Sequence, residues 1–153
     1  MIDPRRGGRR GVPRGALDGL LGFVVGRLGV PVRGVWQLET RGRRSGRPRR
    51  VPVIPLGRGP VRHLVAPRGQ TAWARNLRAD GRGSLRRGPR RWPFRATEVH
   101  GEERVRVLED YIRANRRLTG RFFEVGDPVR TEDVARIAQR HPVFRLEADR
   151  AHR

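Results

Sequence analysis

The sequence predicts a mainly β domain, an antiparallel barrel with helices added at its periphery. Short apolar runs with strand-like alternation recur along the chain, and turns rich in glycine and proline separate them. Longer segments between and after these runs carry apolar residues at helical spacing. A chain of 153 residues suits one such domain and is long enough to bury a core.

The N-terminal part of the chain differs in composition from the rest. Residues 1–15 are rich in arginine, glycine and proline, so they predict a disordered basic arm. Residues 16–30 form a leader, within which residues 16–28 predict a weak, glycine-containing helix with one apolar face. That helix packs either on the protein's own core or on a membrane surface, and both interpretations stay open. Residues 31–153 are predicted to form a single domain.

Six strands are predicted from the apolar alternation: 35–40, 50–56, 61–66, 84–86, 91–99 and 142–147. The turn at 57–60 is expected to join the second and third strands into a hairpin. Gly88-Pro89 is expected to join the fourth and fifth in the same way. In the fifth strand, Trp92, Phe94 and Ala96 share one face and arginines occupy the other.

Three further helices are predicted at 71–79, 102–118 and 131–139. Thr71 and Thr131 are expected to be the N-caps of the first and third. The second has an acidic first turn, which suits the helix dipole. Its expected apolar face carries Val105, Leu108 and Ile112, together with Asn115.

Charge and cysteine content limit the classes of function. The chain has 36 basic and 15 acidic residues, for a formal charge of +21, and every basic residue is arginine. This excess predicts an anionic partner: a polyanionic cofactor, nucleic acid or an acidic membrane surface. The absence of cysteine excludes disulfides, thiol nucleophiles and thiolate metal sites. Without an apolar run of about 18 residues, no membrane-spanning helix is predicted. We expect a cytoplasmic protein whose leader could touch the inner face of the plasma membrane.

Self-sufficient catalytic residues are not evident in the sequence. The four histidines are scattered and lack metal-ligand spacing, so no metal site is predicted. Ser45 and Ser84 lack the setting of a nucleophile elbow. If the protein is an enzyme, we expect a bound cofactor to perform the chemistry and assign no catalytic side chain.

The most informative stretch is 38–53, which reads as an anion cradle between two strands. Six of the ten residues from Arg41 to Arg50 are arginine, and Ser45 and two glycines lie among them. Arginine binds phosphate bidentately, and glycine lets backbone N–H groups turn toward an anion.

The same stretch resembles the Thr-Gly-Arg-Lys-Ser-Gly-x-x-Arg-x-x-Pro pattern of the deazaflavin-dependent nitroreductase family, oxidoreductases that use coenzyme F420. Arg44 stands where lysine is usual and keeps the charge. Residues 63–69 are similar to a second family segment, with Pro67 at the usual serine position. Residues 72–80 resemble its Trp-Tyr-x-Asn-Leu-x-Ala helix. The resemblance covers about residues 35–148, and the matching residues of the first motif are Thr40, Gly42, Arg43, Arg44, Ser45, Gly46, Arg49 and Pro52.

This resemblance implies a split β-barrel like that of flavin reductases and pyridoxamine-phosphate oxidases, with F420 as cofactor. It implies hydride transfer from the reduced deazaflavin to a small electron-poor acceptor, such as a quinone, enone or nitro compound. The phosphate would be held by Arg43, Arg44, Ser45 and Arg49, and Gly46 would also belong to the cofactor site. The middle of the cofactor would lie on Arg50, Val51 and Pro52, and the ring would be framed by Val65, Ala66, Pro67, Arg68, Ala72, Trp73, Ala74, Arg75 and Asn76.

Rival interpretations remain at this level. Arginine clusters at 41–50 and 86–95, with Trp92 and Phe94 interleaved, would also suit a nucleic-acid-binding barrel without enzymatic activity. A split barrel that binds FMN or haem is a second alternative, and a membrane-surface protein that has lost catalysis is a third. We expect a monomer or a weak dimer.

Overall fold

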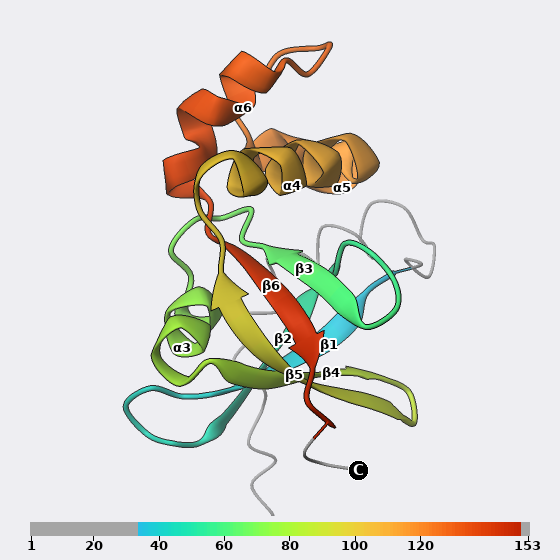
Figure 1. Cartoon of the computed structure of the whole chain (residues 1–153), viewed down its shortest axis with the longest axis vertical. Helices are drawn as coiled ribbons and strands as arrows, with labels where there is room; N and C mark the ends of the chain where they lie inside the picture. The colour runs from blue at the N-terminus through green and yellow to red at the C-terminus, as the bar shows by residue number, and fades with distance from the viewer. Residues whose placement is uncertain (1–33, 151–153) are drawn as a thin grey trace, which may run out of the picture.

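The computed structural model describes residues 34–150 (Figure 1). The predictions of a basic arm at 1–15 and a leader at 16–30 lie outside these residues. Within the described part, no helix combines the length and apolar character needed to cross a bilayer. The strands are β1 (Trp36–Arg41), β2 (Pro48–Val53), β3 (Val61–Val65), β4 (Arg82–Arg87), β5 (Arg90–Glu98) and β6 (Val143–Ala148). The helices are α3 (Ala72–Asp80), α4 (Gly101–Ala114), α5 (Arg116–Thr119) and α6 (Thr131–Ile137), and two 3-10 turns follow α5 and α6, η1 (Gly120–Phe122) and η2 (Ala138–Arg140).

All six strands belong to one antiparallel sheet in the order β2-β1-β4-β5-β6-β3. The sheet curls, and its two ends are β2 and β3. The segment after β2 reaches β3 only through one bridge, in which the backbones of Leu56 and His63 exchange two hydrogen bonds of 2.9 Å. This curled half-barrel with added helices confirms the predicted mainly β, split-barrel fold.

The predicted hairpin over 50–66 is wrong. β2 pairs with β1 along its whole length, from Trp36 opposite Val53 to Arg41 opposite Pro48. β3 pairs instead with β6, which lies about 80 residues later in the chain. The turn at 57–60 does reverse the chain, but it yields only the Leu56–His63 bridge. The pairing of β3 with β6 joins segments that are far apart in the sequence, and a turn motif at 57–60 cannot predict such a pairing. The β4–β5 hairpin, by contrast, forms as predicted.

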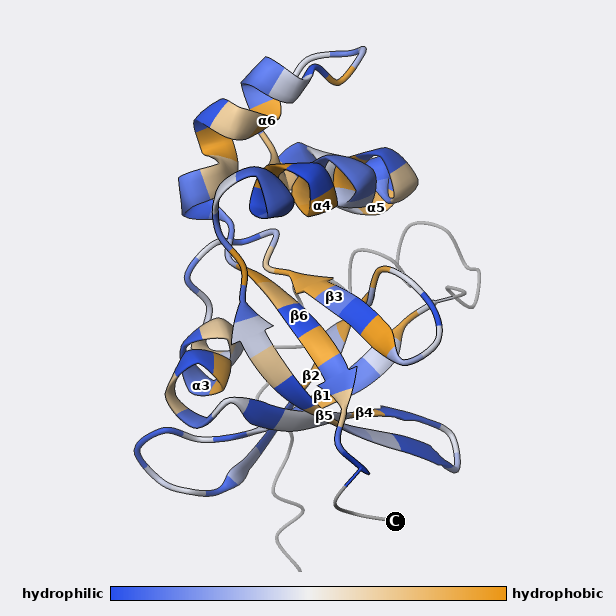
Figure 2. Ribbon diagram, in the orientation of Figure 1, coloured by the Kyte–Doolittle hydropathy of each residue, from blue (hydrophilic) through white to orange (hydrophobic). Residues whose placement is uncertain are grey.

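Side chains on one face of the strands fill the interior of the barrel. Figure 2 shows hydrophobic residues separated by hydrophilic ones along β6. Side chains on the inner face, such as Leu38, Leu85 and Phe94, are at most 1% exposed. Helix α3 covers this core with Trp73 and Leu77. Each buried leucine or phenylalanine contributes roughly 1.5–3 kcal/mol of transfer free energy, so this inner face stabilises the curl of the sheet.

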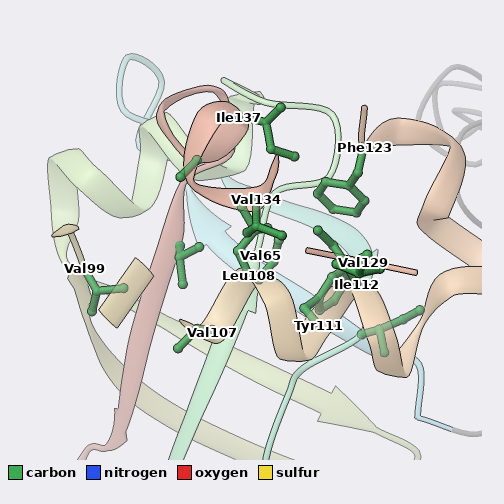
Figure 3. Packing of buried hydrophobic residues seen from close by; sticks show 13 residues of the cluster. Val65, Val99, Val107, Leu108, Tyr111, Ile112, Phe123, Val129, Val134 and Ile137 are labelled. Carbon is green, nitrogen blue, oxygen red and sulfur yellow. The ribbon is translucent and has the colours of Figure 1, made fainter. Parts of the chain in front are cut away.

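A second apolar cluster joins α4 and α6 to one end of the barrel (Figure 3). Leu108, Tyr111 and Ile112 of α4 are at most 1% exposed, and Tyr111 packs edge-on against Phe123 at 6.1 Å. The buried cation Arg104 fixes the start of α4, since its guanidinium donates to the carbonyl of Val99 at 2.8 Å and to Glu98 at 3.1 Å.

Three details of the predicted helices are wrong. The helix expected over 102–118 breaks at Asn115, whose backbone leaves helical geometry (ψ 22°) and separates α4 from α5. The buried face includes Val107 where the pattern placed Val105, because α4 turns its Val107 side toward the sheet. The N-cap of α6 is Arg130, not Thr131, whose hydroxyl donates to Glu109 at 3.1 Å. Thr71 is the N-cap of α3 as predicted, although its hydroxyl makes no cap hydrogen bond.

We expect Leu108→Ala to lower the free energy of unfolding by about 2–5 kcal/mol, because the substitution leaves a cavity in the α4–α6 cluster. Asp110→Ala, on the exposed side of the same helix, should change it by no more than about 0.5 kcal/mol. Urea unfolding followed by circular dichroism measures both. Equal losses in the two variants would mean that α4 does not anchor the barrel through this face.

Candidate functional site

The loop between β1 and β2 is closed tightly by its own backbone. The Gly42 N–H donates to the Arg47 carbonyl, and the Gly46 N–H donates to the Gly42 carbonyl, both at 2.8 Å. Gly46 has a φ of +68°, and a Cβ at Gly42 would lie 2.7 Å from the Ser45 hydroxyl oxygen. Both positions therefore require glycine. The Ser45 hydroxyl accepts a hydrogen bond from the Arg47 N–H at 3.2 Å and keeps its own proton available for an anion.

One buried side chain ties this loop to α3. The Asn76 carbonyl oxygen accepts from the Arg43 backbone N–H at 3.2 Å and from the Arg43 guanidinium at 3.1 Å. Its amide nitrogen donates to the Thr40 hydroxyl at 3.2 Å. Asn76 and Thr40 are both 3% exposed. The resemblance placed Asn76 beside the cofactor ring, and the structure adds a positioning role for it.

A groove of about 790 Å³ lies between this loop and the start of α3. Within the described chain, Arg44, Arg47 and Arg49 form no ion pair, so their donors are free for an anion. Trp73 lines the groove while packing on Phe144 of the core at 6.1 Å between ring centroids. Its ring thus contributes to both the core and the wall of the groove.

The predicted site residues separate into two groups. Nine of them line the groove: Arg43, Arg44, Ser45, Arg49, Arg50, Val51, Ala72, Trp73 and Asn76. Three more lining residues were missed by the prediction, namely Gly42, Arg47 and Pro48. Their position between the predicted residues of one short loop was the available signal.

The remaining predicted residues do not line this groove. Val65, Ala66 and Ala74 are buried at 0–4% exposure, and Gly46 borders a different hollow, of about 340 Å³. Pro52 is half-buried and Arg75 is exposed on α3. Pro67 and Arg68 border a separate hollow of about 470 Å³.

That separate hollow contains an aromatic ring between two cations. The guanidinium carbons of Arg68 and Arg121 lie 5.3 and 4.8 Å from the centroid of Phe122. The neighbouring His141 is buried against Phe123, and its Nδ1–H donates to the Ala66 carbonyl at 3.2 Å. Burial lowers the pKa of His141 below its ordinary value of 6.5, and the hydrogen bonds to Ala66 and Pro67 oppose this only in part.

The aromatic residues of the rival nucleic-acid interpretation point inward. Phe94 is 1% exposed, and one face of Trp92 is covered by the Arg62 guanidinium at 5.0 Å. Neither ring is presented as a stacking platform on the surface. Among the described residues, no group of histidines or carboxylates is arranged to hold a metal ion.

Comparison with known families identifies the chain. The family model described as F420H(2)-dependent quinone reductase matches residues 22–121, well over half of the sequence. The chain belongs to this family. It is therefore an F420-dependent oxidoreductase with F420 as its cofactor, and the resemblance seen in the sequence is confirmed. This membership favours F420 over FMN or haem.

Solved structures support the fold. A structure described as an F420-H2 dependent reductase (FDR-A) has a TM-score of 0.53 and 24% identity, over 78% of this chain and 100% of that one. A structure described as a domain-swapped dimer has a TM-score of 0.53 and 21% identity, over 77% and 83%. A FAD-binding protein from Mesorhizobium loti has a TM-score of 0.52 and 16% identity, over 78% and 83%. A comparison with curated protein sequences gives no significant match.

The groove combines donors for an anion with apolar surface. Among the described residues, Arg44, Arg47 and Arg49 without an ion pair and the Ser45 hydroxyl provide the donors, and the apolar surface comes from Val51, Ala72 and Trp73.

We predict that stability falls as the pH is lowered from 7 to 5. The pKa of His141 is lower in the folded protein, so the unfolded chain binds more protons below about 6.5 and acidification favours unfolding. His141→Gln removes this titration and should make the loss shallower. The loss should not vanish, because burial also lowers the pKa of His63. Unfolding free energies between pH 8 and 5 test this, and an unchanged slope in the variant would contradict it.

Proposed function

We propose that the chain transfers a hydride from reduced F420 to a quinone, or to a similarly electron-poor enone or nitro compound. The observation that carries this proposal is the groove between the arginine loop and α3, where unpaired cations adjoin the ring of Trp73. The family's described activity supports a quinone as the first acceptor to consider.

Within this proposal, the phosphodiester lies on the β1–β2 loop. Arg44 and Arg49 donate to its oxygens, the Ser45 hydroxyl adds a third donor, and Gly42 and Gly46 give the loop the tight curvature that presents them. Asn76 holds Arg43 and hence the loop against α3. A fixed loop lowers the entropy that binding would otherwise lose.

The ring lies on the apolar wall of the groove that Val51, Ala72 and Trp73 form. Trp73 is held in place by its packing on Phe144, at 6.1 Å between ring centroids. Bound F420 supplies the hydride itself. The chain orients the ring and excludes water from one side of it, and solvent delivers the proton to the reduced acceptor.

Two expectations from the sequence remain part of the proposal. The leader, outside the described residues, would let the enzyme approach the inner face of a membrane, where quinones dissolve. The oligomeric state would be monomer or weak dimer.

A panel of acceptors tests the reaction. With reduced F420 as donor, we expect quinones to reoxidise the cofactor faster than enones or nitroaromatics, followed by the recovery of F420 absorbance and fluorescence. NADH in place of reduced F420 should give no reaction, because the family's described activity depends on F420H2. If none of the acceptors accelerates reoxidation above the rate without protein, the proposed reaction is wrong.

Arg44→Ala combined with Arg49→Ala should weaken F420 binding on the order of 100-fold or more. Each charge-assisted bond to phosphate is worth about 1.5–3 kcal/mol, and the double variant removes two. Fluorescence titration of F420 measures the dissociation constant. The control, Arg58→Ala with Arg130→Ala, removes two exposed arginines elsewhere and should change it far less. Wild-type affinity in the first variant would place the phosphate elsewhere.

A further inference from the structure

The β4–β5 hairpin ends in a group of arginines that the proposed function does not use. Two arginines precede its Gly88-Pro89 turn and two follow it, and we call these four the hairpin cluster: Arg86, Arg87, Arg90 and Arg91. Within residues 34–150, none of the four takes part in an ion pair. Arg86 is half-buried and the other three are exposed. The cluster is therefore an accessible and uncompensated positive charge.

The register of the hairpin places like charges directly opposite one another. Arg86 pairs across the ribbon with Arg91, and Arg87 pairs with Arg90. Because side chains alternate along a strand, the first pair lies on the outer face of the sheet and the second on the face of Trp92. Like charges in such pairs destabilise a sheet. An anionic partner that contacts both faces of the tip would remove this repulsion.

The tip of the hairpin stands clear of the rest of the described molecule. Gly88 has a φ of +57° and is the first residue of a two-residue turn, a position at which glycine suits the twist of a hairpin. A Cβ at Gly88 would meet no atom within 4 Å. Figure 1 shows the turn at the lower right, on the side of the barrel away from α4 and α6. The cluster can therefore approach a flat surface without obstruction by these helices.

Two tryptophans and a further arginine lie at the base of the tip. The guanidinium carbon of Arg62 lies 4.9 Å from the ring centroid of Trp36 and 5.0 Å from that of Trp92. The guanidinium carbon of Arg87 lies 5.9 Å from the ring centroid of Trp36. Tryptophan is enriched at the level of lipid headgroups, and arginine extends its charge to that level from a less polar position. The base of the hairpin thus has the residue types of a membrane–water interface.

We propose that the hairpin cluster binds anionic lipid headgroups and docks the protein on a membrane surface. Its guanidinium groups donate hydrogen bonds to lipid phosphates, and the negative potential of the surface attracts them. A nucleic acid offers the same phosphates, but Arg62 covers the Trp92 ring beside the cluster, so no stacking surface for bases adjoins it. The choice of a membrane also rests on the proposed function, because a quinone acceptor dissolves in a bilayer.

Sedimentation of the full chain with lipid vesicles tests this docking surface. The wild type should bind vesicles that contain phosphatidylglycerol better than vesicles of phosphatidylcholine alone, and added salt should weaken the binding. Arg87→Gln with Arg90→Gln should weaken binding to the anionic vesicles on the order of tenfold, because each arginine near such a surface contributes to the affinity. Arg117→Gln with Arg130→Gln, an equal loss of exposed charge at the helical end, should keep wild-type binding.

Two further measurements separate a loss of binding from a loss of folding. The glutamine variant of the hairpin should unfold at the wild-type temperature or above it, since it removes a like-charge pair. Arg87→Lys with Arg90→Lys keeps the charge and should bind anionic vesicles nearly as the wild type does.

Three results would overturn the proposal. Wild-type vesicle binding in Arg87→Gln with Arg90→Gln would place the docking surface elsewhere. Equal losses in this variant and in Arg117→Gln with Arg130→Gln would mean that net charge alone attracts the protein. Binding of the wild type to a DNA or RNA duplex but not to anionic vesicles would assign the cluster to nucleic acid.

These measurements are independent of the proposed reaction. Vesicle binding uses neither F420 nor an acceptor, so a positive result stands even if no acceptor reoxidises the cofactor. Conversely, a wild type that ignores anionic vesicles overturns the docking surface and leaves the reduction of a water-soluble quinone unaffected.

Discussion

The candidate site depends on one buried amide. Asn76 connects Thr40 at the end of β1 with Arg43 in the loop, so the arginine cluster is held against α3. Three hydrogen bonds to a side chain that is 3% exposed make this contact costly to break, because each would leave a buried polar group unpaired. The groove exists because sheet, loop and helix meet at this residue.

The acidic residues are distributed in a way that leaves the loop positive. With 15 acids against 36 arginines, most cations cannot be paired. The pairs that do form mostly stabilise the helical end of the barrel. Glu98 binds both Arg78 and Arg104, and Glu109 binds Arg113. The Arg78 hydrogen bond lowers the pKa of Glu98, which keeps this junction charged at neutral pH. Of the groove arginines, Arg50 alone has a carboxylate partner among the described residues.

The excess of arginines over acidic residues affects both the stability of the protein and its binding of anions. Unpaired arginines on one loop repel one another in the free protein, and an anionic cofactor relieves that repulsion. Anything that binds only the folded state also stabilises it. The excess charge is thus left for binding under the proposed function, while the apolar faces of the strands and helices hold the fold.

The sequence alone determined the features that local chemistry decides. The glycines at 42 and 46, the arginines between them and the β4–β5 turn are encoded by neighbouring residues, and the motif at 38–53 was enough to indicate the family and its cofactor. Only the tertiary structure decided that β2 and β3 lie at the two edges of the sheet. It also decided that Asn76 positions the loop. Pro67 and Arg68 lie on a hollow apart from the groove, which is likewise a result of the tertiary structure. Those results depend on contacts between residues 33 to about 80 positions apart. Such contacts form because burying apolar faces brings distant segments together, and no short stretch of sequence specifies which partners will meet.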